Sequence, residues 1–271
     1  MSILVVGHYC HDTLVGNAST QRTLGGSAAY ASAILEALGE PHEVVAKAGP
    51  DFLHAGLVSR PPRVVPGART TAFVDDYRGP ERRERVEAVA PPIEPEDLAG
   101  GFDVALACGI AGEVPLRTLR RMREISRVLI ADAQSLLREI SPAGEVLLRP
   151  PTPEALELVN VLKASRKEAE ALDVASLRER LTVVVTDGAR GCAILRRGRE
   201  VRVEAFPARE IDPTGAGDCF AAGLAAGLAR GLPIERAARL GAFCGARAVE
   251  HVGVPRLTLE QARAALLCAG D

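Results

Sequence analysis

The stretch Ile211-Asp212-Pro213-Thr214-Gly215-Ala216-Gly217-Asp218-Cys219-Phe220 sets small residues and a carboxylate before an apolar run that predicts a helix over about 219–228. A helix start has free backbone N–H groups and the positive end of the helix dipole, so it attracts anions. Gly215 and Gly217 lack a Cβ, so a phosphate can approach the backbone closely. Asp218 would stand beside that phosphate, where a carboxylate can take a proton from an attacking hydroxyl. The stretch predicts a phosphate site next to a base, although an ordinary helix cap with a tight turn also accounts for these residues.

Short apolar runs alternate with helix-like segments along most of the chain. Strands that alternate with helices predict an α/β fold, with a mostly parallel sheet between two layers of helices. A chain of 271 residues can form one large core of this kind, so we expect a single domain over residues 1–271. The expected strands are 3–7, 44–49, 104–108, 128–131, 159–162 and 182–186, with helices at 27–38 and 115–125. Ligands of such sheets bind beyond the carboxyl ends of the strands, where Gly7, Asp132 and Thr186 lie.

Two segments, residues 13–24 and 69–89, have no helical periodicity. Within the second, residues 70–74 and 83–89 are interpreted as strands separated by a polar turn. Together the two segments predict a small β-sheet that projects from the main domain. A surface hairpin is an equally simple interpretation of the same residues.

Composition and charge argue against several classes of protein. The chain is 47% hydrophobic and 25% charged, with a net charge of −2, which is typical of a globular protein rather than a nucleic-acid binder. No apolar run is long enough to span a membrane. The six cysteines have no zinc-like spacing, and the first residues enter a strand without a signal-peptide pattern. We therefore expect a cytoplasmic protein with reduced thiols.

The glycine-rich stretch resembles the C-terminal signature of the PfkB, or ribokinase-like, carbohydrate kinase family, whose core is Asp-Thr-Gly-Ala-Gly-Asp. Pro213 is inserted before the threonine, which the family tolerates. The resemblance implies a three-layer ribokinase-like sandwich with a β-sheet lid over the sugar. It also implies ATP as donor with Mg²⁺, Asp218 as the catalytic base, and an anion hole formed by the N–H groups of Gly215, Ala216 and Gly217.

The same resemblance assigns an acceptor site near the N-terminus. Asp12 follows the first predicted strand, where an aspartate is usually a turn or cap residue, but the family uses one here to bind sugar hydroxyls. A carboxylate suits this task because it can accept two hydroxyl donors at once. Gly25 and Gly26 match the family's di-glycine, which lets the substrate touch backbone, although they would also serve a simple helix entry.

A nucleotide site is implied further along the chain. Ser165 and Glu168 occupy the place of the family's Asn-x-x-Glu motif, in which the glutamate orients magnesium-bound water; without the family, Glu168 is simply a solvated helix residue. The loop after the sixth strand resembles the family's nucleotide loop, although by itself it is a strand-to-strand turn. The residues assigned to this loop and to the adenine border are Thr186, Gly188, Gly191 and Gly253. The resemblance also implies a potassium ion near Asp212 and Thr214. It further implies a homodimer that forms through the lid.

Other classes of protein fit the sequence less well. A Walker-type hydrolase needs a Gly-Lys pair, and the chain has none. A nicotinamide dehydrogenase needs Gly-x-Gly-x-x-Gly after the first strand, but Gly7 is followed by His-Tyr-Cys-His-Asp. A non-catalytic sugar- or nucleotide-binding regulator would keep the fold and lose the base or the cradle, and this chain keeps both.

The acceptor is indicated by three strings that resemble the plant-type myo-inositol kinase branch of the family. They are Gly7-His8-Tyr9-Cys10-His11-Asp12, Leu162-Lys163-Ala164-Ser165 and Val249-Glu250-His251-Val252-Gly253-Val254-Pro255. Ribokinase itself has Asn, Lys and Asn where this chain has Cys10, Ser27 and Tyr30. A cyclic polyol such as myo-inositol is therefore the expected acceptor, with another sugar or a nucleoside as the alternative.

Overall fold

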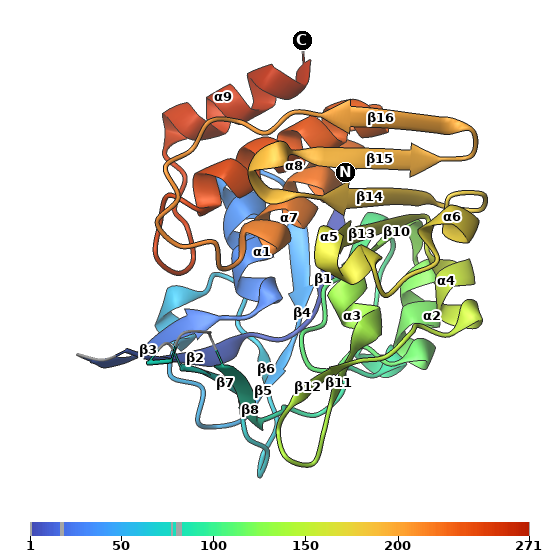
Figure 1. Cartoon of the computed structure of the whole chain (residues 1–271). Coiled ribbons are helices and arrows are strands. Elements are labelled where there is room, and N and C mark those ends of the chain that lie inside the picture. Colours follow the sequence, from blue (N-terminus) through green and yellow to red (C-terminus); the bar gives the residue numbers. More distant parts are fainter. Residues whose placement is uncertain (1, 17–18, 77, 80–82, 271) are drawn as a thin grey trace.

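The computed structural model describes residues 2–16, 19–76, 78–79 and 83–270. Its centre is an eight-stranded sheet in the order β16-β15-β14-β13-β10-β9-β1-β4 (Figure 1). Neighbouring strands are parallel from β4 to β14, and β15 and β16 extend the sheet as antiparallel strands. The strands are β1 (Ile3–Val6), β4 (His42–Val45), β9 (Phe102–Ala107), β10 (Ser126–Asp132), β13 (Val161–Ser165), β14 (Thr182–Thr186), β15 (Cys192–Arg196) and β16 (Arg199–Val203).

Helices cover both faces of this sheet, which makes the three-layer α/β/α sandwich that the sequence predicts. On one face lie α1 (Ser27–Ala37), α7 (Ala216–Ala229), α8 (Ile234–Ala248) and α9 (Leu259–Gly270). On the other lie α2 (Leu116–Glu124), α3 (Ala133–Leu137), α4 (Pro153–Leu158), α5 (Arg166–Ala169) and α6 (Val174–Leu177).

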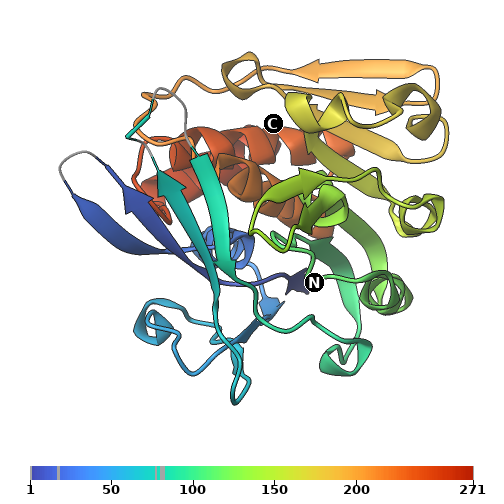
Figure 2. The same cartoon turned by 60° about the horizontal axis from the view of Figure 1, so that its bottom comes forward.

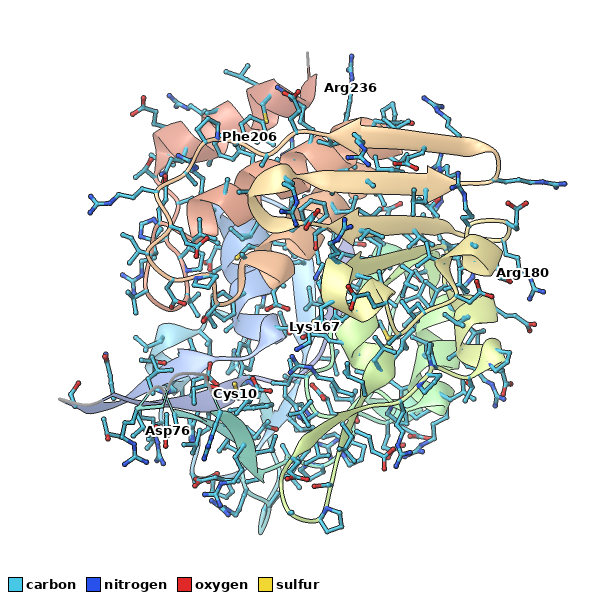
Figure 3. All side chains as sticks on the ribbon, viewed as in Figure 1. Cys10, Asp76, Lys167, Arg180, Phe206 and Arg236 are labelled. Atoms are coloured by element: carbon cyan, nitrogen blue, oxygen red, sulfur yellow. The ribbon has the colours of Figure 1, made fainter. Side chains whose placement is uncertain are left out.

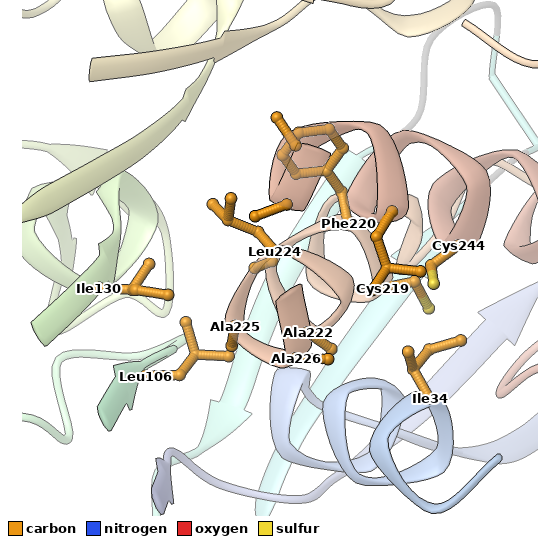
Figure 4. Packing of buried hydrophobic residues seen from close by; sticks show 14 of the residues in the cluster. Ile34, Leu106, Ile130, Cys219, Phe220, Ala222, Leu224, Ala225, Ala226 and Cys244 are labelled. Atoms are coloured by element: carbon orange, nitrogen blue, oxygen red, sulfur yellow. The ribbon is translucent and has the colours of Figure 1, made fainter. Parts of the chain in front are cut away.

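Alternation along the buried strands divides the core into two parts. Ile3 and Val5 of β1 face the layer that contains α7, whereas Leu4 and Val6 face the opposite layer. This is the period of two expected for a strand buried on both sides. Figure 4 shows α7 packed between sheet residues such as Leu106 and the neighbouring helices. The sheet therefore holds the start of α7 against the carboxyl ends of its central strands.

A second, four-stranded sheet stands apart from the main one and forms the predicted lid (Figure 2). Its order is β3-β2-β7-β8, with β2 and β7 parallel and the outer pairs antiparallel. Its strands are β2 (Cys10–Val15), β3 (Thr20–Gly25), β7 (Thr71–Asp76) and β8 (Arg83–Ala88). Residues 17–18, 77 and 80–82 of the predicted lid segments lie outside the described residues.

Short elements connect these two sheets. The strand pair β5 (Lys47–Ala48) and β6 (Arg63–Val64) lies in the chain between the lid strands β3 and β7, and the hairpin of β11 (Arg138–Ile140) and β12 (Val146–Leu148) follows α3. Three 3₁₀ turns complete the described part of the chain: η1 (Ala55–Leu57), η2 (Pro95–Asp97) and η3 (Gly188–Arg190). Among the described residues, no helix is both long and apolar enough to cross a lipid bilayer.

The structure corrects three predicted boundaries. The strand predicted at 159–162 is instead Val161–Ser165, and Asn160 before it accepts a hydrogen bond from Leu129 N at 2.8 Å through its side-chain oxygen. The strand predicted at 44–49 is divided between β4 and β5, which belong to different sheets. The helix predicted at about 219–228 starts earlier, at Ala216, so the glycine-rich stretch forms its first turn.

Candidate active site

The glycine-rich stretch opens α7 with unused backbone donors. Gly215 is the N-cap residue with φ 75°, a left-handed conformation that favours glycine. Ala216 N donates to Pro213 O and Cys219 N to Gly215 O. Over the described part of the chain, no acceptor is recorded for the N–H groups of Gly215, Gly217 or Asp218. An anion is the natural partner for three such donors at the positive end of a 14-residue helix.

Asp218 lies in the first turn of α7 and is held by a side chain from the neighbouring helix α3. Gln134 Nε2 lies 3.1 Å from Asp218 Oδ1 and 2.8 Å from Ser27 Oγ, at the start of α1. Burial raises the pKa of Asp218, while Lys163 and the Ser27 hydroxyl act in the opposite direction. A carboxylate that is oriented by donors and whose pKa is raised is suited to accept a proton.

The predicted acceptor residues come together on the lid side of the molecule. Asp12 is inside β2 rather than in a turn, and its carboxylate lies directly on Gly25, where an added Cβ would be 1.8 Å from Asp12 Oδ2. Gly26 has φ 90°, and a Cβ there would lie 2.4 Å from His8 O. Cys10 Sγ donates to Asp12 Oδ1 at 2.9 Å. Both positions therefore need glycine. A side chain at position 25 would collide with the Asp12 carboxylate, and one at position 26 would collide with the backbone of His8.

Tyr30 joins the predicted acceptor residues to the glycine-rich stretch of residues 212–218, which is named the phosphate loop after its predicted role. Its ring packs on Gly215, with Cε1 2.1 Å from where a Cβ would be. Burial raises the pKa of the Tyr30 phenol, and the charges of Asp12 and Asp218 raise it further. The tyrosine therefore lies near both carboxylates.

The predicted nucleotide residues lie along the carboxyl ends of β13 and β14. Ser165 pairs in register with Thr186, whose hydroxyl donates to Ala164 O at 3.3 Å. Ser165 is also the N-cap of α5, where Glu168 Oε2 accepts from Ser165 N at 2.8 Å and from Ser165 Oγ at 2.7 Å. Glu168 is thus a capping residue, a role that the sequence analysis did not predict for it. Its second carboxylate oxygen has no partner recorded among the described residues. In Figure 3, Lys167 marks α5 and Cys10 marks the lid strand β2.

The loop from β14 to β15 is shaped by two glycines. Gly188 has φ 54°, and Gly191 has φ 80°, where an added Cβ would lie 2.0 Å from Val203 O. Asp187 N donates to Gly191 O at 2.8 Å and closes the turn. The Asp187 carboxylate pairs with Arg166 at 3.2 Å and Arg190 at 2.7 Å. Two guanidinium groups therefore flank this loop.

Asp212 connects the start of the phosphate loop to the C-terminal segment. Its Oδ1 accepts from Thr214 N at 2.9 Å, and its Oδ2 accepts from Gly253 N at 3.4 Å. Asp212 N donates to Val249 O at 3.1 Å. Asp212 and Thr214, predicted beside a potassium ion, and Gly253, predicted at the adenine border, are thus neighbours.

The sequence analysis missed Gln134 and Lys163 as functional candidates, and it noted Asp132 only as lying at a strand end where ligands bind. Lys163 Nζ lies 2.8 Å from Asp132 Oδ2, and the two side chains are 6% and 1% exposed. Burial raises the pKa of Asp132 to about 6 although Lys163 opposes this shift. The available signal for Lys163 was its place directly after an apolar strand. The predicted strand ended at Leu162, so Lys163 was left outside it. Gln134 had no sequence signal.

The residues fit a magnesium ion that is bound mainly through water and substrate. Within residues 2–16, 19–76, 78–79 and 83–270, no three His, Cys, Asp or Glu side chains form a metal cluster. Mg²⁺ often keeps several waters and takes only one or two carboxylates together with substrate phosphates. The unengaged oxygen of Glu168 would be such a ligand or would hold metal-bound water.

Known proteins resemble this chain in sequence over nearly its whole length. It is 43% identical over 274 residues to inositol 3-kinase of Oryza sativa subsp. japonica, covering 93% of this chain and 69% of that protein. It is 36% identical over 271 residues to inositol 3-kinase of Arabidopsis thaliana, covering 95% and 76%.

Solved structures share the fold. A pyrophosphate-dependent kinase in the ribokinase family, complexed with a pyrophosphate analog and myo-inositol, matches with a TM-score of 0.81 at 20% identity, covering 97% of this chain and 99% of that one. Arabidopsis thaliana ribokinase with ribose and ATP matches with a TM-score of 0.78 at 18% identity, covering 98% of each chain. Because residues 71–261 also match the family model for pfkB family carbohydrate kinases, and the curated relatives align over most of their length, this chain belongs to that family.

Proposed function

We propose that this protein is an inositol kinase that transfers the γ-phosphoryl group of ATP to a hydroxyl of myo-inositol. The supporting observation from the structure is Asp218, which lies in a helix turn with unused N–H donors. The proposed acceptor follows from plant relatives that are inositol 3-kinases and align over 93% and 95% of this chain.

In the proposed reaction, Asp12 binds neighbouring hydroxyls of the acceptor, while the backbone of Gly25 and Gly26 lies behind the ring. Asp218 takes the proton of the attacking hydroxyl. Of the N–H groups predicted to form the anion hole, those of Gly215 and Gly217 would donate to the phosphoryl oxygens, and the N–H group of Asp218 would join them. The N–H group of Ala216, which was also predicted, donates to Pro213 O instead. Phosphoryl transfer depends mainly on such positioning and charge stabilisation, and closure of the lid would exclude water.

The donor side of the proposal uses the residues at the ends of β13 and β14. ATP would lie along Ser165, Thr186 and Gly188, with Gly191 and Gly253 shaping the loops that border the nucleotide. The second carboxylate oxygen of Glu168 would hold water bound to Mg²⁺. A potassium ion would bind beside Asp212 and Thr214, and activity measured with and without K⁺ tests this site.

Two further expectations stay predictions. The first is a homodimer formed through the lid sheet, which sedimentation of the protein alone would test. The second is a cytoplasmic location, which imaging or fractionation in the source cells would test.

The proposed function is tested with purified protein and a panel of acceptors. Inositols, pentoses, hexoses and nucleosides are each offered with Mg-ATP and, in parallel, with pyrophosphate. We expect kcat/KM for myo-inositol with ATP to exceed that for ribose by at least about tenfold, because a buried polar group without its partner costs roughly 1–3 kcal/mol. A preference for ribose or a nucleoside would overturn the acceptor, and use of pyrophosphate alone would overturn the donor.

A protein of a different class also remains to be tested, namely a regulator that binds nucleotide and sugar without turnover. Binding of ATP and myo-inositol without any product from the full panel would favour that class.

A further inference from the structure

A lysine occupies a core position below the start of α7. Along β13, Val161 faces the layer that contains α7, whereas Leu162 and Ala164 face the opposite layer. Alternation therefore points Lys163 toward α7, and its side chain is 6% exposed. Buried lysines are rare because taking an ammonium group out of water is costly. A charge at this position needs a reason beyond the packing of the core.

The lysine touches the phosphate loop itself. A Cβ on Gly217 would lie 2.8 Å from Lys163 Nζ and 3.7 Å from its Cε. The ammonium group therefore packs against the backbone of Gly217, inside the first turn of α7. Any larger residue at position 217 would displace it.

The Asp132 carboxylate binds this ammonium group, and the charges of Glu168 and Asp218 also act on it. Asp132 Oδ2 accepts from Lys163 Nζ at 2.8 Å. Burial alone would lower the pKa of Lys163, but Asp132, Glu168 and Asp218 together raise it. These carboxylates therefore favour the charged ammonium form of Lys163. An ammonium group has three donors, and a single hydrogen bond from Nζ is recorded among the described residues, to Asp132.

The helix start by itself opposes a cation at this location, and the three carboxylates offset that effect. The first turn of α7 carries the positive end of the helix dipole, which favours negative charge and repels a cation. A phosphoryl group at the turn would instead be attracted by the helix start and by the lysine together, in a partly buried place where such attraction is strong.

We propose that Lys163 is a catalytic residue that binds the transferring phosphoryl group of the donor from below the anion hole, while Asp132 fixes its ammonium group in place. This inference rests on the proposed kinase function. During transfer, the bond from the acceptor oxygen to phosphorus forms, and the bond from phosphorus to the bridging oxygen of ADP breaks. The hydroxyl proton passes to Asp218, and Lys163 keeps its three protons throughout.

The experiment compares binding of Mg-ATP and Mg-ADP by calorimetry in wild type and Lys163→Gln. Only ATP carries the transferring group, so the substitution should weaken ATP binding by at least about tenfold and leave ADP binding nearly unchanged. Turnover should fall by a similar or larger factor. An unchanged ratio of the two dissociation constants, together with unchanged kcat, would overturn the assignment.

Two further variants separate this role from folding. Lys47→Gln removes another buried, paired lysine, which contacts Asp97 and Pro92 O, and it should leave both dissociation constants unchanged. If Lys163→Gln does not fold, Asp132→Asn combined with Lys163→Gln removes both charges and keeps the side-chain volumes. That double variant should show the same selective loss of ATP binding, and equal affinity changes for ATP and ADP would contradict the proposal.

The outcome is also separable from the proposed function. Wild-type protein that binds ATP more tightly than ADP but phosphorylates no acceptor would contradict the kinase proposal, while the comparison of ATP with ADP still decides the role of Lys163. If wild type binds neither nucleotide, pyrophosphate and inorganic phosphate replace them as the probes. Equal effects of Lys163→Gln on these two probes would then overturn the proposal.

Discussion

The ring of Tyr30 lies on the backbone of Gly215, so close that a Cβ on this glycine would be 2.1 Å from the ring carbon Cε1. The contact joins α1, which begins beside the proposed acceptor site, to the loop proposed to bind the donor. Gly215 also has φ 75°, a conformation that side chains disfavour. The phosphate loop therefore depends on the absence of a side chain here for two separate reasons.

Gly215→Ala should reduce turnover much more than its backbone strain alone explains. The new methyl group would displace either Tyr30 or the start of α7, and so misplace the N–H donors. Steady-state kinetics with thermal unfolding would measure this. Gly231→Ala is the matched control, because Gly231 also has φ 75° but open space around it. It should cost about 1 kcal/mol of stability and leave kcat unchanged; equal loss of activity in both variants would contradict the importance of the Tyr30 contact.

Asp218→Asn should keep the fold and lose most turnover. Asparagine has nearly the same shape but cannot accept the proton, and general-base help is worth about 10²–10⁴-fold in rate. Calorimetry should show that Mg-ATP still binds. Near-normal kcat in this variant would remove Asp218 from the mechanism.

Gln134→Met should shift the pH dependence of turnover. The active form of Asp218 is its carboxylate, so rate is lost as pH falls through a pKa that burial already raises. Gln134 donates to that carboxylate, and removing a donor to the charged form raises the pKa further. The acid limb of the kcat profile should therefore move to higher pH.

The control for this shift is Gln261→Met on α9, where Gln261 accepts from Thr258 N at 2.9 Å. Its profile should match the wild type. An acid limb that does not move in Gln134→Met would show that Gln134 has no influence on the base.

The alternation of apolar runs was enough to predict the parallel sheet and its helical layers, because each buried strand has a strong local signal. The lid was predicted from the lack of helical period, and its strands β2 and β7 pair in parallel although far apart in sequence. The order of the strands was not predictable, since pairing depends on contacts that no local pattern records.

The sequence could indicate a candidate site where one short motif marks it, and could not where the fold assembles it. The stretch around Asp218 indicates a helix start by its glycines. Gln134 reaches Asp218 across 84 positions of sequence, and Asp132 meets Lys163 across 31. The second contact exists only because β10 and β13 are neighbours in the sheet, and the first because α3 follows β10 to the same edge.

Glu168→Gln should raise the concentration of Mg²⁺ needed for half-maximal turnover, with a smaller effect on stability. Glutamine can still form the capping box with Ser165, so the substitution removes the negative charge and keeps the helix start. Titration of Mg²⁺ at fixed ATP would measure the change. Glu170→Gln, one residue beyond α5, should behave as wild type. An unchanged Mg²⁺ requirement in Glu168→Gln would leave Glu168 with a capping role only.

Asp12→Ala should raise KM for every acceptor or abolish activity, because the acceptor loses the carboxylate that binds its hydroxyls. Asp76→Ala is the control on the same sheet, since the Asp76 carboxylate pairs with Arg78 at 2.6 Å at the exposed end of β7. Gly25→Ala tests the same site from the other side, because its methyl group would occupy the place of Asp12 Oδ2. Asp12→Ala and Gly25→Ala should therefore share one phenotype, a high acceptor KM with normal ATP binding. An unchanged KM in Asp12→Ala would place the acceptor pocket elsewhere and leave the phosphate loop as the donor site.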